Sequence, residues 1–228
     1  MLHRVRLAVL DLAGTTMADD GLVLDAVRTG LRAARVRVDG PRYPALDRQA
    51  RATMDRSTIT VFGELLDGDM YRARRANDAF EESVCEAVRR GRVREVPGAG
   101  AAMTAIREAG LSVALICGFG PALRDRLVEA LDWGERVDVV LSPADVAGQG
   151  LPDPAVVHAA ARLCDVPAEQ VAVAGDSIAD IEGAVRAGAA LAVGVRTGAH
   201  SEPRLRAAGA DAVIDSVIDL PALLGLPS

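Results

Sequence analysis

The sequence predicts a doubly wound α/β fold, in which helices cover both faces of a parallel sheet. Short apolar runs typical of buried parallel strands recur along the chain, at residues 7–10, 111–116, 137–141, 171–174, 191–195 and 212–214. Segments expected to be helical alternate with these runs, at residues 97–109, 121–131 and 153–163. Gly110, directly after the first of these segments, is a common helix end. Alternating strands and helices predict βαβ units and therefore a parallel sheet.

One block interrupts this alternation after the first strand. Its apolar residues recur at helical spacing, beginning with Leu22, Val23, Ala26, Val27 and Leu31. A break rich in Pro and Arg follows at residues 39–44, and further helices are expected up to residue 92. The block carries charge runs that we interpret as solvated helix faces. The chain is therefore divided into a core, residues 1–16 and 93–228, and an inserted helical domain, residues 17–92.

Length and composition narrow the functional classes. A chain of 228 residues can form one or two domains with a substantial core. Its net charge of -6 gives no electrostatic reason to expect nucleic acid, and no apolar stretch approaches the roughly 18 residues of a membrane span. The first strand begins so early that we expect no signal peptide. Cys85, Cys117 and Cys164 lack metal-site spacing and are odd in number, so we expect a reduced, cytoplasmic protein.

The first apolar run ends in a carboxylate. Asp11 follows residues 7–10 directly and precedes the turn residues Gly14, Thr15 and Thr16. In an open parallel sheet, ligands bind beyond the carboxyl ends of the strands, so Asp11 is placed to face a substrate. Asp also commonly begins a turn or caps a helix, and this stretch alone leaves both interpretations open.

A second apolar run ends in the same way. Residues 171–174 lead into Gly175 and Asp176, with Asp180 one turn further on. Two strands that both end in Asp can bring carboxylates together at one edge of the sheet. Oxygen ligands of this kind favour a hard cation such as Mg²⁺.

These two stretches resemble motifs of a known family. DLAGTT at residues 11–16 and GDSIAD at residues 175–180 are similar to the first and fourth motifs of the haloacid dehalogenase-like hydrolase superfamily. The phosphonatase-like branch is more similar still, since it has AGTT after the first Asp and a later run like TGAHS at residues 197–201. The resemblance extends over nearly the whole chain. It implies a Rossmann-like core and an all-helical cap, inserted where residues 17–92 lie.

The resemblance also implies roles for individual residues. Asp11 would be the nucleophile, and a carboxylate nucleophile splits one difficult displacement into two easier steps. Mg²⁺ would be held by Asp11, the backbone carbonyl of Ala13, Asp176 and Asp180. Backbone N–H groups near Ala13 and Gly14 would bind phosphoryl oxygens. Four residues are assigned to substrate binding: Gly14, Thr15, Gly118 and Arg56.

Two departures from the family pattern concern proton transfer and the cap. Ordinary phosphatases of this superfamily carry a second Asp, the general acid and base, where this chain has Ala13, which cannot move a proton. Phosphonoacetaldehyde hydrolase also has Ala there, but it uses a cap lysine that forms a Schiff base with its substrate. Thr58 takes the place of that lysine, and the chain contains no lysine at all. The Schiff-base mechanism is therefore excluded.

Two further departures concern phosphate binding. The second motif normally offers Thr or Ser to a phosphoryl oxygen, where this chain has Cys117, and a thiol is a weak donor. Cys117 is either a small buried hydrophobe or a group that faces Asp11 and reacts with, or shapes the pocket for, an unusual substrate. The third motif normally supplies a cation, but residues 148–152 hold no basic residue, which disfavours a phosphate dianion beside Asp11. Three residues are candidates to replace this cation: Arg56, Arg124 and Arg196.

The residues leave three functions open. The first is a phosphonatase-like hydrolase that acts through Asp11 and Mg²⁺ on a small phosphorylated or related metabolite. The second is a catalytically degenerate member that binds a metabolite or a protein partner. The third is a dehalogenase-type C–X hydrolase or lyase, which also lacks the second Asp but relies on the missing cation. We expect a small-molecule substrate and no nucleic-acid or membrane partner, and the resemblance permits a homodimer through the cap.

Overall fold

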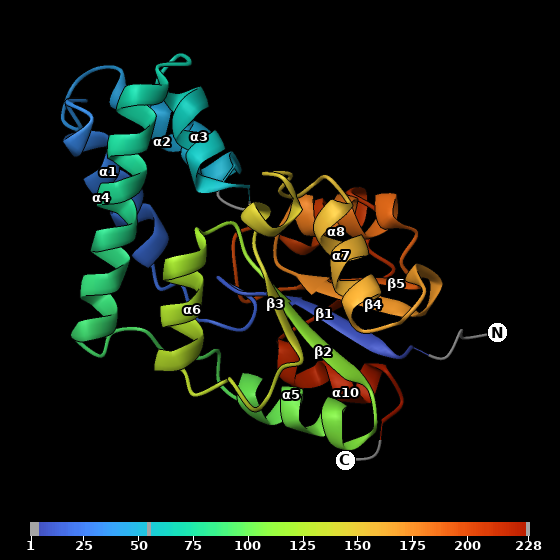
Figure 1. Ribbon diagram of the computed structural model, residues 1–228. Coiled ribbons are helices and arrows are strands. Elements are labelled where there is room, and N and C mark those ends of the chain that lie inside the picture. The colour runs from blue at the N-terminus through green and yellow to red at the C-terminus, as the bar shows by residue number, and fades with distance from the viewer. Residues whose placement is uncertain (1–4, 54–55, 227–228) are drawn as a thin grey trace.

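The computed structural model describes residues 5–53 and 56–226, and its centre is a six-stranded parallel sheet (Figure 1). The strands lie in the order β3-β2-β1-β4-β5-β6. Their bounds are β1 (Leu7–Asp11), β2 (Ser112–Ile116), β3 (Val139–Leu141), β4 (Val171–Gly175), β5 (Leu191–Val195) and β6 (Ala212–Ile214). In the register of the sheet, Leu10 of β1 pairs with Leu115 of β2 on one side and with Ala174 of β4 on the other. The predicted doubly wound α/β class is confirmed.

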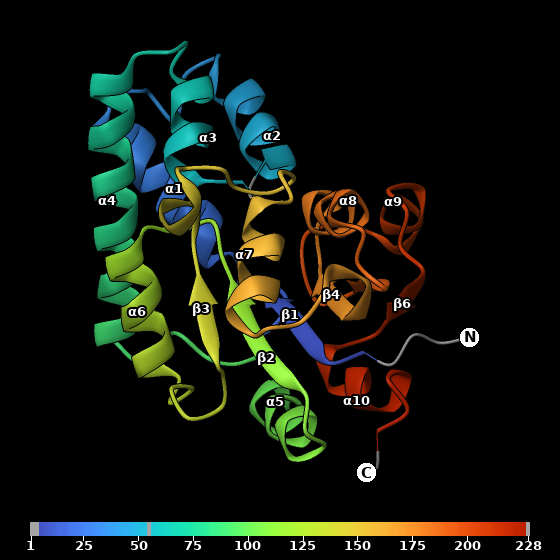
Figure 2. The same cartoon turned by 45° about the vertical axis from the view of Figure 1, so that its right-hand side comes forward.

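Helices cover both faces of the sheet because the strand side chains alternate between them. Ala8 and Leu10 belong to one core cluster with Met103 of α5, whereas Leu7 and Val9 belong to another. Figures 1 and 2 show α7 and α8 on one side of the sheet and α5 and α10 on the other. The helices of this part are α5 (Ala99–Glu108), α6 (Pro121–Ala130), α7 (Ala155–Leu163), α8 (Ile178–Ala187), α9 (Glu202–Ala207) and α10 (Leu220–Leu223). Single-turn 3₁₀ helices lie at Pro143–Val146, Ala168–Gln170 and Val217–Asp219.

Two elements begin two residues later than the sequence predicts, and near the start of each an aspartate side chain accepts a hydrogen bond from a nearby backbone N–H. The strand expected from residue 137 begins at Val139, and the carboxylate of Asp138 accepts a hydrogen bond from the N–H of Val113 at 2.8 Å. The helix expected from residue 153 begins at Ala155, whose N–H donates to the carboxylate of Asp153 at 2.9 Å. Apolar periodicity does not register these local hydrogen bonds.

Four helices form an insertion between β1 and α5, which we call the helical insertion. They are α1 (Leu22–Ala33), α2 (Tyr43–Thr53), α3 (Thr58–Leu65) and α4 (Met70–Arg89), and Figure 1 shows them beside the sheet rather than on its faces. Helices α1 and α4 pack closely because Gly30 carries no side chain: a Cβ there would lie 2.5 Å from the carbonyl oxygen of Ala76. Phe62 of α3 packs edge-on against Phe80 of α4, with ring centroids 6.0 Å apart.

The helical insertion contacts the core at the loop that follows β2. The N–H of Thr58 donates to the carbonyl oxygen of Gly118 at 3.1 Å, and the ring of Phe119 lies 5.8 Å from that of Phe80. Gly118 is closely covered, since a Cβ there would lie 2.6 Å from the carbonyl oxygen of Arg56. None of the described helices is long and apolar enough to cross a membrane.

Candidate active site

Three carboxylates converge at the carboxyl edge of the two central strands. Asp11 ends β1, Asp176 directly follows β4, and Asp180 lies in the first turn of α8. One carboxylate oxygen from each lies within 4.8 Å of the others. Strands β1 and β4 are neighbours at the point where the strand order reverses, which is where open α/β sheets bind ligands. The three carboxylates that the sequence predicts as metal ligands are therefore brought together.

Asp180 is held by a capping box at the start of α8. Its Oδ2 accepts hydrogen bonds from the hydroxyl of Ser177 at 2.6 Å and from the N–H of Ser177 at 3.0 Å. In return, the N–H of Asp180 donates to the Ser177 hydroxyl at 3.1 Å. Gly175 leaves room for this arrangement, because a Cβ there would collide with Asp180.

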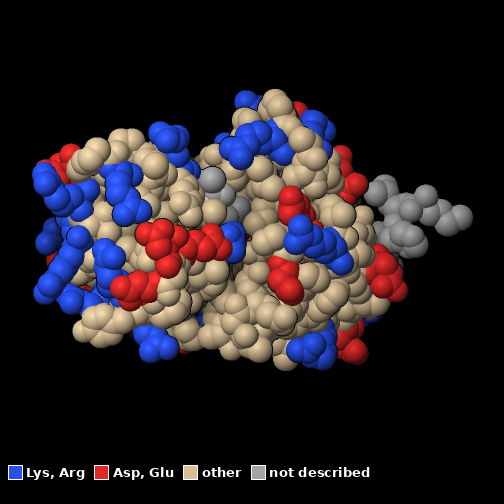
Figure 3. Space-filling view, turned by 90° about the horizontal axis from the view of Figure 1, so that it is seen from above, with Lys and Arg blue, Asp and Glu red and all other residues tan. Residues whose placement is uncertain are grey.

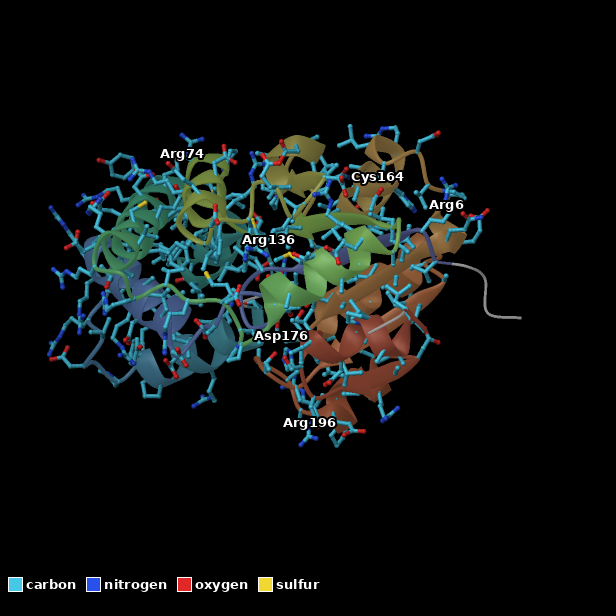
Figure 4. The ribbon with its side chains drawn as sticks, turned by 90° about the horizontal axis from the view of Figure 1, so that it is seen from below. Arg6, Arg74, Arg136, Cys164, Asp176 and Arg196 are labelled. Carbon is cyan, nitrogen blue, oxygen red and sulfur yellow. The ribbon has the colours of Figure 1, made fainter. Side chains whose placement is uncertain are left out.

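Asp176 is held at both of its carboxylate oxygens. The hydroxyl of Thr15 donates to Oδ1 at 3.0 Å, and the N–H of Ala199 donates to Oδ2 at 2.6 Å. Two glycines border the carboxylate: a Cβ at Gly14 would lie 2.7 Å from Oδ2, and a Cβ at Gly198 would collide with it. Figure 4 shows Asp176 where the core meets the helical insertion.

A cavity of about 390 Å³ lies against these carboxylates. Its wall combines Asp11, Cys117 and Asp176 of the core with Asp19 and Asp20, which precede α1. Four carboxylates thus line the cavity, and no basic side chain does among the described residues. Burial raises the pKa of Asp19 above its ordinary value, although its carboxylate accepts a hydrogen bond from the N–H of Val23 at 2.8 Å. The cavity is an acidic environment.

Cys117 is buried at the wall of this cavity. Burial raises the pKa of its thiol to about 12, and the negative charge of Asp11 contributes to the rise. Cys117 is therefore a neutral thiol at physiological pH. Leu151, from the segment where the family carries its cation, is also buried and lines a small space together with Cys117. The second-motif position therefore holds a weakly polar thiol, and the third-motif segment contributes an apolar side chain.

None of the three candidate arginines lines the Asp11 cavity. Arg56 forms a two-pronged ion pair with Glu64, at 2.8 and 3.0 Å, and lines a different cavity of about 460 Å³. Arg196 pairs with Asp215 at 2.6 Å, and Figure 4 shows it at the edge of the molecule.

Arg124 is the most enclosed of these three arginines, with 12% of its side chain exposed. It pairs with Asp145 at 2.6 Å and with Asp125 at 2.8 Å. Its charge lowers the pKa of the Cys117 thiol, but less than the Asp11 charge raises it. Two carboxylates therefore already pair with the cation whose charge acts on Cys117.

The other sequence-predicted residues divide into two groups. Ala13, Gly14 and Gly118 line the Asp11 cavity, whereas Thr15 and Thr58 do not. Thr15 is fully buried with its hydroxyl directed to Asp176, and the hydroxyl of Thr58 donates to Asn77 at 2.7 Å. The N–H of Gly14 already donates to the carbonyl oxygen of Met17 at 2.7 Å. The substrate-binding roles assigned to Gly14, Thr15, Gly118 and Arg56 all stay predictions.

Sequence reasoning missed the residues that hold the carboxylates in place. Ala199 and Gly198 position Asp176, and Ser177 positions Asp180. Ala199 and Gly198 belong to the TGAHS run at residues 197–201, which supported the family resemblance, but neither residue was assigned a role. No sequence pattern indicated that Asp19 and Asp20 line the Asp11 cavity, because their approach to Asp11 depends on how the helical insertion folds back.

Known proteins resemble this chain in sequence or in fold. The plasmid phosphoglycolate phosphatase of Cupriavidus necator is 35% identical over 128 residues, which are 56% of this chain and 54% of that protein. The match therefore spans about half the length of that relative. A hydrolase from Pseudomonas syringae has a TM-score of 0.83 at 21% identity, covering 96% of this chain and 98% of that one. A phosphonoacetaldehyde hydrolase-like protein from Oleispira antarctica has a TM-score of 0.80 at 21% identity, covering 98% and 92%. At such identities the two structures show the shared fold.

A match to a protein family covers more of the chain than the match to the Cupriavidus necator relative. Residues 5–188 match the haloacid dehalogenase-like hydrolases, and this range holds β1, β4 and all three clustered carboxylates. The chain therefore belongs to the haloacid dehalogenase-like hydrolase family.

Proposed function

We propose that this protein hydrolyses a small phosphorylated metabolite, using Asp11 as the nucleophile together with Mg²⁺. The observation that carries the proposal is the convergence of the Asp11, Asp176 and Asp180 carboxylates beside a cavity of about 390 Å³. Family membership supports hydrolysis as the reaction class. The phosphonatase-like branch is supported by the AGTT and TGAHS runs, without its Schiff-base chemistry, since the chain has no lysine.

The donor set fits a hard divalent cation. Three carboxylates this close repel one another, and a cation among them would offset that repulsion. Each oxygen of Asp176 already accepts a hydrogen bond, but a carboxylate oxygen can accept more than one interaction. Mg²⁺ would be held by Asp11, Asp176, Asp180 and the carbonyl of Ala13. When bound, it would shield the approach of the Asp11 carboxylate to an anionic phosphoryl group.

The chain's own residues would then perform a two-step displacement. An oxygen of Asp11 attacks phosphorus while the bond from phosphorus to the leaving oxygen breaks. The leaving oxygen takes its proton from water, because Ala13 cannot donate one. Water next attacks the phosphorus of the phosphorylated Asp11, releasing phosphate and restoring the carboxylate. The missing acid predicts slow turnover of esters with poor leaving groups.

We further propose that residues 17–92 act as a cap over this cavity. Asp19, Val23 and Leu24 all belong to that segment and all line the cavity. The contact of Phe119 with Phe80 supports a cap that rests on the loop after β2. A homodimer through the cap stays a prediction.

The charge of the cavity restricts the substrate. Asp11, Asp19, Asp20 and Asp176 line it, and among the described residues no arginine does. A substrate with a second anionic group would therefore meet further repulsion without a partner. Phosphoglycolate, the substrate in the name of the Cupriavidus necator relative, carries such a group. We expect phosphate esters whose alcohol portion is neutral or cationic to react faster than phosphoglycolate.

The same observation favours a second candidate function. A family member without a cation at the cavity wall and with Ala13 in place of the acid could bind a metabolite without turning it over. In that case the carboxylate cluster would still bind Mg²⁺, but no phosphate would be released.

The test is a screen for phosphate release from small phosphate esters and phosphonates, with Mg²⁺ or with EDTA. Asp11→Asn is compared with Asp78→Asn, which changes an exposed Asp on α4. Activity that needs Mg²⁺, survives in Asp78→Asn and disappears in Asp11→Asn supports the proposal. If a folded protein that binds Mg²⁺ releases no phosphate from any of these compounds, the result supports the binding function instead. Halide release from haloacids in EDTA would indicate dehalogenase chemistry, and it would overturn both the hydrolysis of phosphate esters and the binding function.

A further inference from the structure

A second cavity lies within the helical insertion and shares no lining residue with the Asp11 cavity. It has a volume of about 280 Å³ and lies among the segment after α1, the start of α2 and the connection from α3 to α4. Its floor is apolar: Leu65 and Leu66 are each 3% exposed, and Val36 and Leu46 are half-buried. A volume close to the lower limit of ligand sites, about 300 Å³, suits a small organic molecule.

Four arginines line this cavity: Arg35, Arg37, Arg42 and Arg72. Asp67 is the one acid among the described lining residues. Arg37 is 3.7 Å from Asp39 and Arg42 is 3.3 Å from Asp67, in exposed ion pairs that contribute little in water. No carboxylate of the described part of the chain forms an ion pair with Arg35 or Arg72. The cavity therefore has an excess of positive charge.

Arg72 is oriented by a backbone carbonyl at the end of α1. Its Nε donates to the carbonyl oxygen of Ala34 at 3.0 Å, and the side chain is half-buried at the cavity wall. This bond fixes the plane of the guanidinium group and leaves the N–H groups of its two Nη atoms as donors. An arginine fixed in this way loses little conformational entropy when it binds an anion.

The two cavities have opposite charge. The whole chain carries a net charge of -6, and the Asp11 cavity is lined by four Asp residues. Figure 3 shows basic side chains gathered over the end of the molecule that the helical insertion forms. A ligand that suits the arginine-lined cavity is therefore unsuited to the Asp11 cavity.

We propose that the arginine-lined cavity binds a small, soluble amphipathic anion. Its carboxylate or phosphate group would be bound by Arg35 and Arg72, since the guanidinium fork matches such groups. Its apolar part would lie over Leu65 and Leu66, where it removes apolar surface from water. This ligand is distinct from the substrate of the Asp11 cavity, so the inference goes beyond the proposed hydrolysis.

The test uses 8-anilinonaphthalene-1-sulfonate, a fluorescent amphipathic anion, as the probe. We expect it to bind with saturation and to be displaced by hexanoate, which carries both an anion and an apolar chain. Acetate and hexylammonium, each lacking one of these features, should not displace it at the same concentration and ionic strength. Displacement by acetate as effective as by hexanoate would show that the apolar floor plays no part and would overturn the proposal.

Variants locate the binding. Arg35→Gln and Arg72→Gln should each weaken probe binding by roughly tenfold, the effect of losing one charged hydrogen bond. Arg204→Gln is the matched control, because Arg204 is an exposed arginine on α9 that does not line the cavity. Unchanged affinity in both variants, with circular dichroism confirming the fold, would overturn the proposal. Binding of the protein to vesicles of an anionic lipid would also overturn the proposal if hexanoate did not compete with it.

Discussion

The N–H of Ala199 lies 2.6 Å from Oδ2 of Asp176, and the hydroxyl of Thr15 lies 3.0 Å from Oδ1 of the same carboxylate. Asp176 is thus fixed by two segments that are distant in sequence, the turn after β1 and the loop after β5. A third hydrogen bond joins these segments, because the hydroxyl of Thr197 donates to the carbonyl oxygen of Gly14 at 2.6 Å. If Asp176 binds Mg²⁺ as proposed, fixing its carboxylate in this way reduces the reorganisation needed when the ion binds.

Gly198→Ala should displace Asp176 and weaken Mg²⁺ binding. A Cβ at position 198 would collide with the Asp176 carboxylate, and Gly198 is not among the residues with left-handed backbone angles, so the effect is steric. Changes in the residues that orient a metal ligand typically reduce affinity about 10–100-fold, and we expect a loss in that range. Isothermal titration calorimetry with MgCl₂ measures it.

Gly134→Ala is the matched control for this substitution. Gly134 also lacks left-handed backbone angles, and a Cβ there would meet nothing within 4 Å. We expect its affinity for Mg²⁺ to equal that of the unmodified protein. If Gly198→Ala retains the same affinity, the loop after β5 does not position the metal ligand.

The fold and the carboxylate cluster could be predicted because both follow from local patterns. Apolar runs predict buried strands, and the carboxyl ends of parallel strands share one edge, so Asp11 and Asp176 had to lie near each other once their strands were neighbours. The strand order itself was not predicted from the sequence; the structure places β1 beside β4. Asp180 followed from its position one helical turn after Asp176.

The electrostatics of the cavity could not be predicted in the same way. Whether an arginine reaches Asp11 depends on its other partners, and Glu64, eight residues along the chain, pairs with Arg56. The approach of Asp19 depends on how the helical insertion folds back over β1. These are tertiary relationships between segments, to which spacing along the sequence is insensitive.

Mg²⁺ should raise the melting temperature, and Asp180→Asn should reduce that rise. The ion would offset repulsion among three carboxylates that exists only in the folded state. At an Mg²⁺ concentration about 100 times its Kd, the stabilisation is about 2.7 kcal/mol, or roughly 5–10 °C for a chain of this size. Differential scanning fluorimetry in MgCl₂ and in EDTA measures the shift. Asp78→Asn should show the full rise, and an equal rise in Asp180→Asn would exclude Asp180 from the site.

Gly118→Ala should loosen the contact between the helical insertion and the core. Its Cβ would lie 2.6 Å from the carbonyl oxygen of Arg56, and backbone on both sides prevents an easy adjustment. Overpacking of this kind costs about 1–3 kcal/mol, measured as a lower midpoint of urea unfolding. Because the carboxylates proposed to bind Mg²⁺ are untouched, Mg²⁺ affinity should stay unchanged. Unaltered stability would show that the loop after β2 yields freely to the insertion.

Cys117 should resist alkylation up to high pH. Burial raises the pKa of its thiol to about 12, so at pH 8 its thiolate fraction is smaller than that of an ordinary cysteine by roughly a thousandfold or more. Cys85, which is half-buried on α4, provides an internal reference. Mass spectrometry after timed exposure to iodoacetamide should find Cys85 modified first, and denaturant should remove the difference. Equal rates in the folded protein would mean that Cys117 is an accessible thiolate beside Asp11, and it would then be a candidate reactive group rather than part of the cavity wall.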